Sequence, residues 1–121
     1  MIRLGIAPIG WTNDDMPELG GDISFEQCIS EMALAGYSGC EVGNKYPVHD
    51  RVYLKHMLDL RGISICNQWF SYEFSTKSFD EVKSNFIKQV DFLSFFGAKV
   101  VGGAETGNSI HGIYDIALNE R

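Results

Sequence analysis

The stretch that decides the fold is residues 24–42, SFEQCISEMALAGYSGCEV. Its apolar residues follow the i, i+3, i+4, i+7 spacing of a helix that packs one face on a core: Phe25, Cys28, Ile29 and Met32. Ser24 and Gln27 form a capping box, in which the Ser24 hydroxyl accepts a hydrogen bond from the Gln27 backbone amide. In return, the Gln27 side chain accepts one from the Ser24 backbone amide. Gly36 supplies the left-handed residue that ends the helix, and residues 37–42 follow at once as a strand.

The same unit of helix, glycine and strand occurs again after a turn marked by glycine and proline. Asp50 is suited to cap a second helix, which offers Leu54, Met57 and Leu58 to the core. Gly62 ends this helix, and residues 63–66 follow as a strand.

A third unit begins at Ser78, which forms another capping box with Glu81. The helix that follows is the longest, and one apolar face is predicted for it: Val82, Phe86, Val90 and Leu93. Gly97 ends the helix, and residues 98–101 are predicted as the next strand.

With a leading strand in the apolar run at residues 2–9, the chain consists of four β/α units. Strands that alternate with helices pair in parallel through right-handed crossovers. Two architectures fit, a finished four-stranded doubly wound sheet or the first four β/α units of a TIM barrel, that is, a half barrel. A barrel takes about 250 residues, so the second requires this chain to be part of a longer one. In both, ligands bind at the carboxyl ends of the strands.

Composition narrows the class of protein. The chain has 121 residues, 45% of them hydrophobic and 12% aromatic, which is enough for one globular domain over residues 1–121. A net charge of -6 argues against binding to nucleic acid. No apolar run approaches the ~20 residues of a membrane span, and no signal peptide is recognisable, so we expect a cytoplasmic protein without membrane contact. The three cysteines form no CxxC pair and are predicted to be buried small hydrophobes: Cys28, Cys40 and Cys66.

Residues whose side chains are suited to catalysis or ligand binding gather where the predicted strands end. They are Trp11, Asn13 and Asp14 in a long first loop, Glu41 and Lys45, Asn67 and Trp69, then Glu105, and finally His111. We predict Glu41 and Glu105 as the catalytic pair of carboxylates and the others as contacts to substrate. No histidine spacing typical of a metal site is present, so we predict no metal ligand within this chain.

Each candidate also has a structural alternative. Glu41 ends a strand in an apolar run, where a carboxylate is costly unless it acts on substrate or is paired with a cation. Lys45 can polarise a substrate oxygen or remain a solvated loop charge. The two tryptophans can stack on a ring or pack on the core, and loop asparagines often cap local turns.

Four segments carry a resemblance to a known family: GIAPIGWTNDDMPELG (residues 5–20), SEMALAGY (30–37), EVGNKYP (41–47) and ICNQWF (65–70). In this order they resemble the N-terminal half of the inosose dehydratases, enzymes of myo-inositol catabolism in the xylose-isomerase-like barrel superfamily. The family's chains are more than twice as long. This chain ends just after the fourth strand, before the strands that supply most metal ligands in related barrels.

The resemblance implies removal of water from 2-keto-myo-inositol, a cyclic polyol ketone. It also implies Mn²⁺ or Co²⁺, with glutathione as a further associated cofactor and ligands expected beyond residue 121. Two alternatives stay open, a sugar isomerase or epimerase of the same superfamily, and a non-catalytic fragment or small binding module. We further expect Glu41, Asn67 and Glu105 to converge on one rim of the sheet, and open sheet edges to drive self-association.

Overall fold

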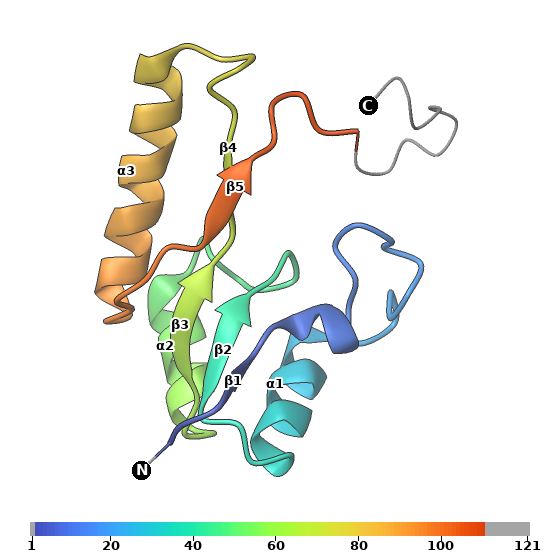
Figure 1. Cartoon of the computed structure of the whole chain (residues 1–121). Helices are drawn as coiled ribbons and strands as arrows, with labels where there is room; N and C mark the ends of the chain where they lie inside the picture. The colour runs from blue at the N-terminus through green and yellow to red at the C-terminus, as the bar shows by residue number, and fades with distance from the viewer. Residues whose placement is uncertain (1, 111–121) are drawn as a thin grey trace.

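The computed structural model describes residues 2–110 and shows a mixed α/β fold (Figure 1). Its elements, in chain order, are β1 (Gly5–Ile6), the 3-10 helix η1 (Pro8–Gly10), α1 (Phe25–Leu34), β2 (Gly39–Val42), α2 (Arg51–Asp59), β3 (Ser64–Gln68), β4 (Phe70–Tyr72), α3 (Phe79–Phe95) and β5 (Gly103–Glu105). Each of the three predicted helices is present, and strands alternate with helices as the sequence indicates.

All strand pairs within the described residues are parallel, which confirms the predicted class of sheet. β1, β2 and β3 form one sheet in that order, and β4 pairs with β5 in a second. Only Trp69 separates β3 from β4, so the two sheets are joined by one nearly continuous strand with a break. The pairs therefore follow chain order, as expected for consecutive units of a (β/α) barrel.

The Gln89 side chain, which the sequence analysis did not single out, bonds to the backbone at the break between β3 and β4. The Gln89 amide of α3 donates to the carbonyl oxygens of Gln68 and Trp69, at 2.8 and 3.1 Å. These two carbonyls lie where the strand ladder is interrupted, and buried backbone acceptors are costly to leave unpaired. Gln89 thereby fixes α3 against the junction of the two sheets.

The capping hydroxyls and the capping carboxylate are present as predicted, but neither capping box shows its return bond within residues 2–110. The Ser24 hydroxyl accepts from the Gln27 amide at 3.1 Å, and Asp50 accepts from the Tyr53 amide at 2.9 Å. Ser78 accepts from the Glu81 amide at 3.3 Å. The Gln27 side chain does not reach back to Ser24, however. It donates to Glu31, one turn along α1, at 2.9 Å, because a carboxylate there offers a charged acceptor.

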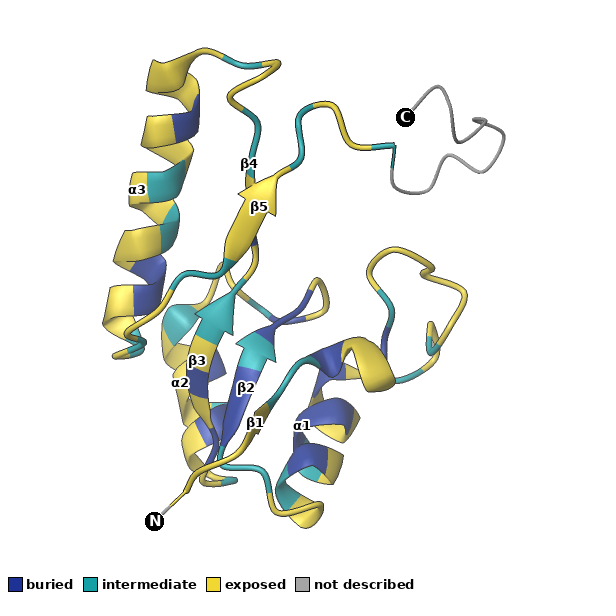
Figure 2. Cartoon of the chain, viewed as in Figure 1, coloured by how far each residue is buried: buried dark blue, intermediate teal, exposed yellow. Residues whose placement is uncertain are grey.

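The helices end where the glycines predict, since Gly36, Gly62 and Gly97 have φ values of +88°, +66° and +75°. The core lies between the sheet and the helices α1 and α2, and Figure 2 shows their buried faces turned toward β2 and β3. The predicted stripe of α1 is buried, as are Leu54 and Leu58 of α2.

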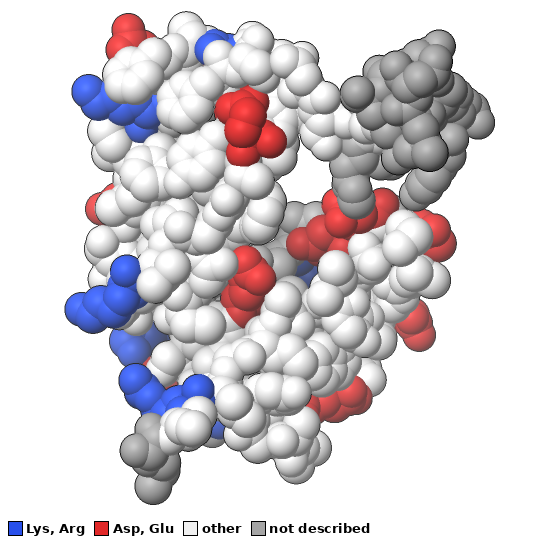
Figure 3. Space-filling view, in the orientation of Figure 1, with Lys and Arg blue, Asp and Glu red and all other residues white. Residues whose placement is uncertain are grey.

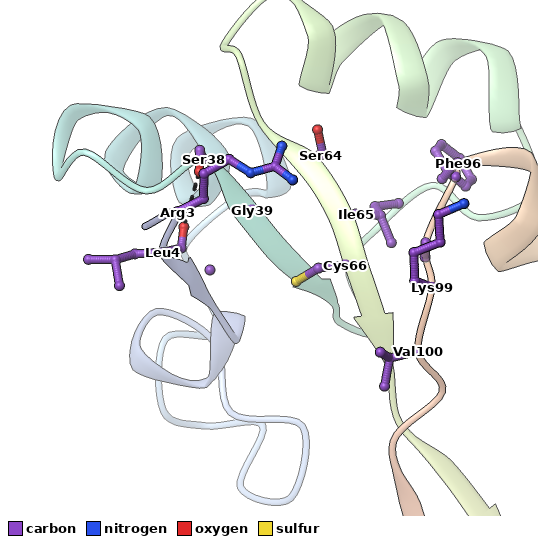
Figure 4. A pocket seen from close by; sticks show the side chains of 13 residues that line it. Arg3, Leu4, Ser38, Gly39, Ser64, Ile65, Cys66, Phe96, Lys99 and Val100 are labelled. Atoms are coloured by element: carbon purple, nitrogen blue, oxygen red, sulfur yellow. Dashed lines mark hydrogen bonds between the residues drawn. The ribbon is translucent and has the colours of Figure 1, made fainter. Parts of the chain in front are cut away.

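Two burial predictions are wrong. Val90 of α3 is 37% exposed, because the helix packs through Val82, Phe92 and Leu93 and turns Val90 away from them. Cys66 is exposed, whereas Cys28 and Cys40 are buried. Cys66 lies on the face of β3 opposite the helices, where it lines a hollow of about 510 Å³ (Figure 4).

The fourth strand begins later than predicted, at Gly103 instead of residue 98. Residues 98–100 line the same hollow as Cys66 and are not paired with β3 (Figure 4). Pairing starts when the Phe70 amide donates to the Gly102 carbonyl at 2.9 Å. At Gly103 the two backbones are so close that a Cβ would lie 2.0 Å from the Phe70 oxygen. The strand therefore starts where glycine permits this approach.

Candidate functional site

The candidate site is a cavity of about 730 Å³ at the carboxyl ends of the strands. Its wall includes four carboxylates, one indole and one buried threonine: Asp14, Asp15, Glu41, Glu105, Trp69 and Thr12. In Figure 3 acidic side chains gather around the central hollow, while basic side chains lie mainly along the left edge of the view. The described lining residues include no Lys, Arg or His, so the wall carries negative charge only.

Glu41 lies near the end of β2, half-buried, and lines this cavity. Its Oε1 accepts a hydrogen bond from the Asn67 amide Nδ2 at 2.8 Å. The alternative of a buried ion pair does not apply, because none of the ion pairs among residues 2–110 involves Glu41. A carboxylate thus faces the cavity with an amide, not a cation, beside it.

Asn67 lies beside Glu41 and not on the cavity wall. Besides donating to Glu41, its side chain accepts from the Gly102 amide at 2.7 Å. This side chain links β2 and β3 to the segment before β5, and the predicted substrate contact stays a prediction.

Two candidates in the first loop hold the fold together instead of facing the cavity. The Trp11 indole donates to Glu31 at 2.6 Å, and its ring packs against the core. The Asn13 side chain accepts from the amides of Asp15 and Met16, at 2.9 and 3.0 Å. Neither residue lines the cavity, and the structure shows the structural alternatives, core packing for Trp11 and turn capping for Asn13.

Lys45 is likewise a structural residue. Its ammonium donates to the carbonyl oxygens of Gly20, Gly21 and Ile23, at 3.0, 2.9 and 2.6 Å. Three carbonyl acceptors occupy the donors of one ammonium group, so in this structure the Lys45 ammonium serves the loops, and its role toward substrate stays a prediction. Lys45 fastens the first loop to the loop after β2.

Asp14, in the same first loop, does line the cavity. Its carboxylate also accepts from the Asn44 amide, at 3.2 Å for Oδ2. This bond is a second link between the first two loops, and it fixes the direction of one acidic side chain of the wall.

Trp69 occupies the break between β3 and β4, and 53% of it is exposed. Its indole nitrogen donates to the Ser71 hydroxyl at 3.3 Å, and the residue lines the cavity. An exposed indole on a polar wall can stack on the C–H face of a sugar-like ring. The strand break places it there.

Glu105, at the end of β5, also lines the cavity, but its carboxylate is already engaged. It accepts hydrogen bonds from the Ser75 hydroxyl at 2.8 Å, the Gly107 amide at 2.9 Å and the Phe74 amide at 3.0 Å. These donors, Ser75 foremost, lower the pKa of the Glu105 carboxyl below its usual range. An ionised carboxylate is a poor proton donor, so this carboxyl is suited to accept hydrogen bonds and not to donate a proton.

We therefore expect Glu105→Gln to destabilise the protein at neutral pH but not in acid. A carboxyl whose folded pKa is lowered stabilises the fold above its unfolded pKa of about 4.3, and the benefit is lost as pH falls through the folded pKa. Urea unfolding of both proteins at pH 7 and at pH 3 tests this. Glu18→Gln, at an exposed position of the first loop, is the control and should cost little at either pH. A difference between wild type and Glu105→Gln that is equal at both pH values would contradict the assignment.

Thr12 was missed by the sequence analysis. It is the single buried polar residue of the part of the chain described, 6% exposed, and it lines the cavity. Its backbone amide donates to the Pro8 carbonyl at 2.9 Å. A threonine between Trp11 and Asn13 carries no signal in the sequence that separates it from ordinary loop residues.

The remaining predictions concern His111 and metal. His111 lies outside the described residues. Among residues 2–110 no group of three or more His, Cys, Asp or Glu side chains is arranged to hold a metal ion. The carboxylates of the cavity wall do not form such a group, so the residues in hand do not fit the Mn²⁺ or Co²⁺ that the resemblance implies. None of the described helices is long and apolar enough to span a bilayer.

Comparison with known proteins identifies the relatives of this chain, although no family model matches it. It is 59% identical over 120 residues to the inosose dehydratase of Glaesserella parasuis serovar 5 and 58% identical over 120 residues to that of Geobacillus thermodenitrificans. Each match covers 99% of this chain and 40% of the relative. The inosose dehydratase of Bacillus thuringiensis is 57% identical over 97% of this chain and 39% of its own length.

These relatives confirm the resemblance seen in the sequence. The parallel β/α units fit part of a TIM barrel, and the chain spans about 40% of the relatives that it matches. Over nearly its whole length, this chain is similar to part of an inosose dehydratase.

Proposed function

We propose that this chain is part of a hydro-lyase that removes water from 2-keto-myo-inositol in the cytoplasm, in the catabolism of myo-inositol. The observation that carries the proposal is identity of 57–59% to proteins named inosose dehydratase. The cavity at the carboxyl ends of the strands supports it, because a half-buried carboxylate, an exposed indole and the buried residue Thr12 line one space.

The charge of the wall favours a neutral polyol over a phosphorylated sugar. Four carboxylates line the cavity, and no basic side chain among its described lining residues would offset a phosphate. Carboxylates accept hydrogen bonds from hydroxyl groups, and Trp69 offers its face to the C–H side of a ring. A cyclic polyhydroxy ketone has both kinds of surface.

In the proposed reaction Glu41 acts as the base. It takes the proton from the carbon next to the carbonyl, and that C–H electron pair forms a C=C bond as the neighbouring C–O bond breaks. The departing hydroxide takes up a proton and leaves as water. The enol that remains rearranges to a trihydroxycyclohexane-1,2-dione, and no electrons are gained or lost overall.

The proton for the departing hydroxide needs an acid, and the hydrogen bonds of Glu105 make it unsuitable. Because the chain spans about 40% of its relatives, we assign that acid to the rest of the longer enzyme. We assign the ligands of any divalent metal there too, since the described residues form no such group.

The experiment compares two proteins. One is the 121-residue chain, and the other is the extended protein, in which these residues are continued by the remaining sequence of the Glaesserella parasuis relative. We expect the extended protein to consume 2-keto-myo-inositol in the presence of Mn²⁺ or Co²⁺ and the short chain to show no turnover. An inactive but folded extended protein refutes the proposed function, and an active short chain refutes the need for the missing part.

The short chain is also expected to self-associate. β1 pairs only with β2, and β5 only with β4, so within the described residues each leaves one edge unpaired. The hollow beside β3 and residues 98–100 adds an uncovered face (Figure 4). Exposed strand edges pair with other chains. Sedimentation velocity should show dimers or larger species for the short chain and fewer for the extended one, and a monodisperse short monomer would speak against open edges.

A further inference from the structure

The orientation of the Asn67 amide is fixed by its neighbours. The Gly102 N–H can only donate, so the atom that faces it at 2.7 Å is the oxygen of Asn67. The NH₂ group of the same amide is then directed at Glu41, whose Oε1 accepts from it at 2.8 Å. Rotating the amide by 180° would place two donors together at Gly102 and two acceptors together at Glu41.

This arrangement leaves one oxygen of Glu41 uncommitted. Oε1 is held by Asn67, whereas no hydrogen bond within residues 2–110 reaches Oε2. Glu41 lines the cavity, and Asn67 is not part of the cavity wall. The amide therefore holds the carboxylate from one side while its other oxygen remains available to a bound molecule.

We infer that Asn67 is a positioning residue, which holds the Glu41 carboxylate in one orientation toward the cavity and is itself held by the Gly102 backbone. The inference rests on the proposed function, in which Glu41 is the base. A base must lie within hydrogen-bond reach of the proton that it takes, and a displacement of about 1 Å can cost ~10²-fold in rate. Asn67 acts through Glu41 and not by touching substrate.

Gly102 gives an independent way to test the same link. A Cβ at this position would lie 2.9 Å from Asn67 Nδ2 and 3.4 Å from Oδ1. Gly102→Ala keeps every polar group of the site but forces the Asn67 amide to move. Gly10→Ala is the matched control, because a Cβ there meets nothing within 4 Å.

The test uses the extended protein and measures kcat and KM separately. Asn67→Ala and Gly102→Ala are each expected to lower kcat by about 10- to 100-fold with little change in KM, whereas Gly10→Ala keeps both. Asn67→Asp has the same shape but places a second carboxylate against Glu41, and it should lower kcat at least as far. A rise in KM at unchanged kcat would make Asn67 a substrate ligand, and unchanged kcat in Asn67→Asp would overturn the inference.

A second measurement separates this inference from the proposed function. In the ¹⁵N-labelled extended protein, Glu41→Gln should shift the side-chain NH₂ signals of Asn67 and leave those of the loop residue Asn44 in place. If the wild-type protein shows no dehydration but the Asn67 signals shift, the proposed function fails while the link between the two side chains stands. If the Asn67 signals do not respond, the positioning role is refuted whatever the activity.

Discussion

Glu41→Gln in the extended protein is expected to lower the turnover of 2-keto-myo-inositol by ~10²- to 10⁴-fold, the usual contribution of a general base. Glutamine has nearly the same shape and keeps an oxygen that can accept from Asn67, so the loss should come from the missing base and not from misfolding. The measurement is the loss of inosose with time at saturating substrate. KM is expected to change little, because the hydroxyl contacts of the wall remain.

The control for this prediction is Glu18→Gln, which removes a carboxylate of the first loop that does not line the cavity. It should keep wild-type turnover. A folded Glu41→Gln enzyme with unchanged turnover would remove Glu41 from the mechanism, and an equal loss in both variants would point to a general effect of charge.

Leu54→Ala is expected to lower the free energy of unfolding by ~2–5 kcal/mol, the range for a large-to-small change in a packed core. Leu54 is fully buried on α2 and belongs to the cluster that joins α1, α2 and the sheet. Small domains are stable by only about 5–15 kcal/mol, so a loss of this size removes a large part of the stability and should move the urea midpoint to a clearly lower concentration. Urea unfolding followed by circular dichroism measures the change.

Leu34→Ala at the end of α1 is the matched control, because Leu34 is 87% exposed. Its cost should stay within about 0.5 kcal/mol, as for most surface substitutions. Equal losses for the two leucines would mean that the helices do not pack on the sheet as described.

The fold could be predicted from the sequence because its signals are local. Capping side chains, the glycine after each helix and the i, i+3, i+4 pattern depend on residues within one or two turns of one another. The start of β5 could not be predicted in this way. It depends on Phe70, which lies 33 positions from Gly103 in the chain but approaches its backbone closely.

The site was predicted less well, and for the same reason. Glu41, Asp14 and Trp69 line the cavity because strand ends meet there, which the alternation of strands and helices already implied. The sequence could not show that Lys45 and Trp11 find partners in other segments. A polar residue near a strand end has two uses, contact with a ligand or attachment of a loop, and only the position of its partners separates them.

The three hydrogen bonds of the Lys45 ammonium also affect where a protease can cut the native chain. Trypsin needs a free lysine side chain and several residues that it can draw out, but the Lys45 ammonium is bound by three carbonyls and Tyr46 beside it is buried. Lys99 is exposed in a segment that belongs to no strand, so limited digestion should cut there more readily than at Lys45. That cut separates α3 from Gly102 and β5, so the nicked chain would lose the attachment of Asn67 while its helices and first three strands stay intact.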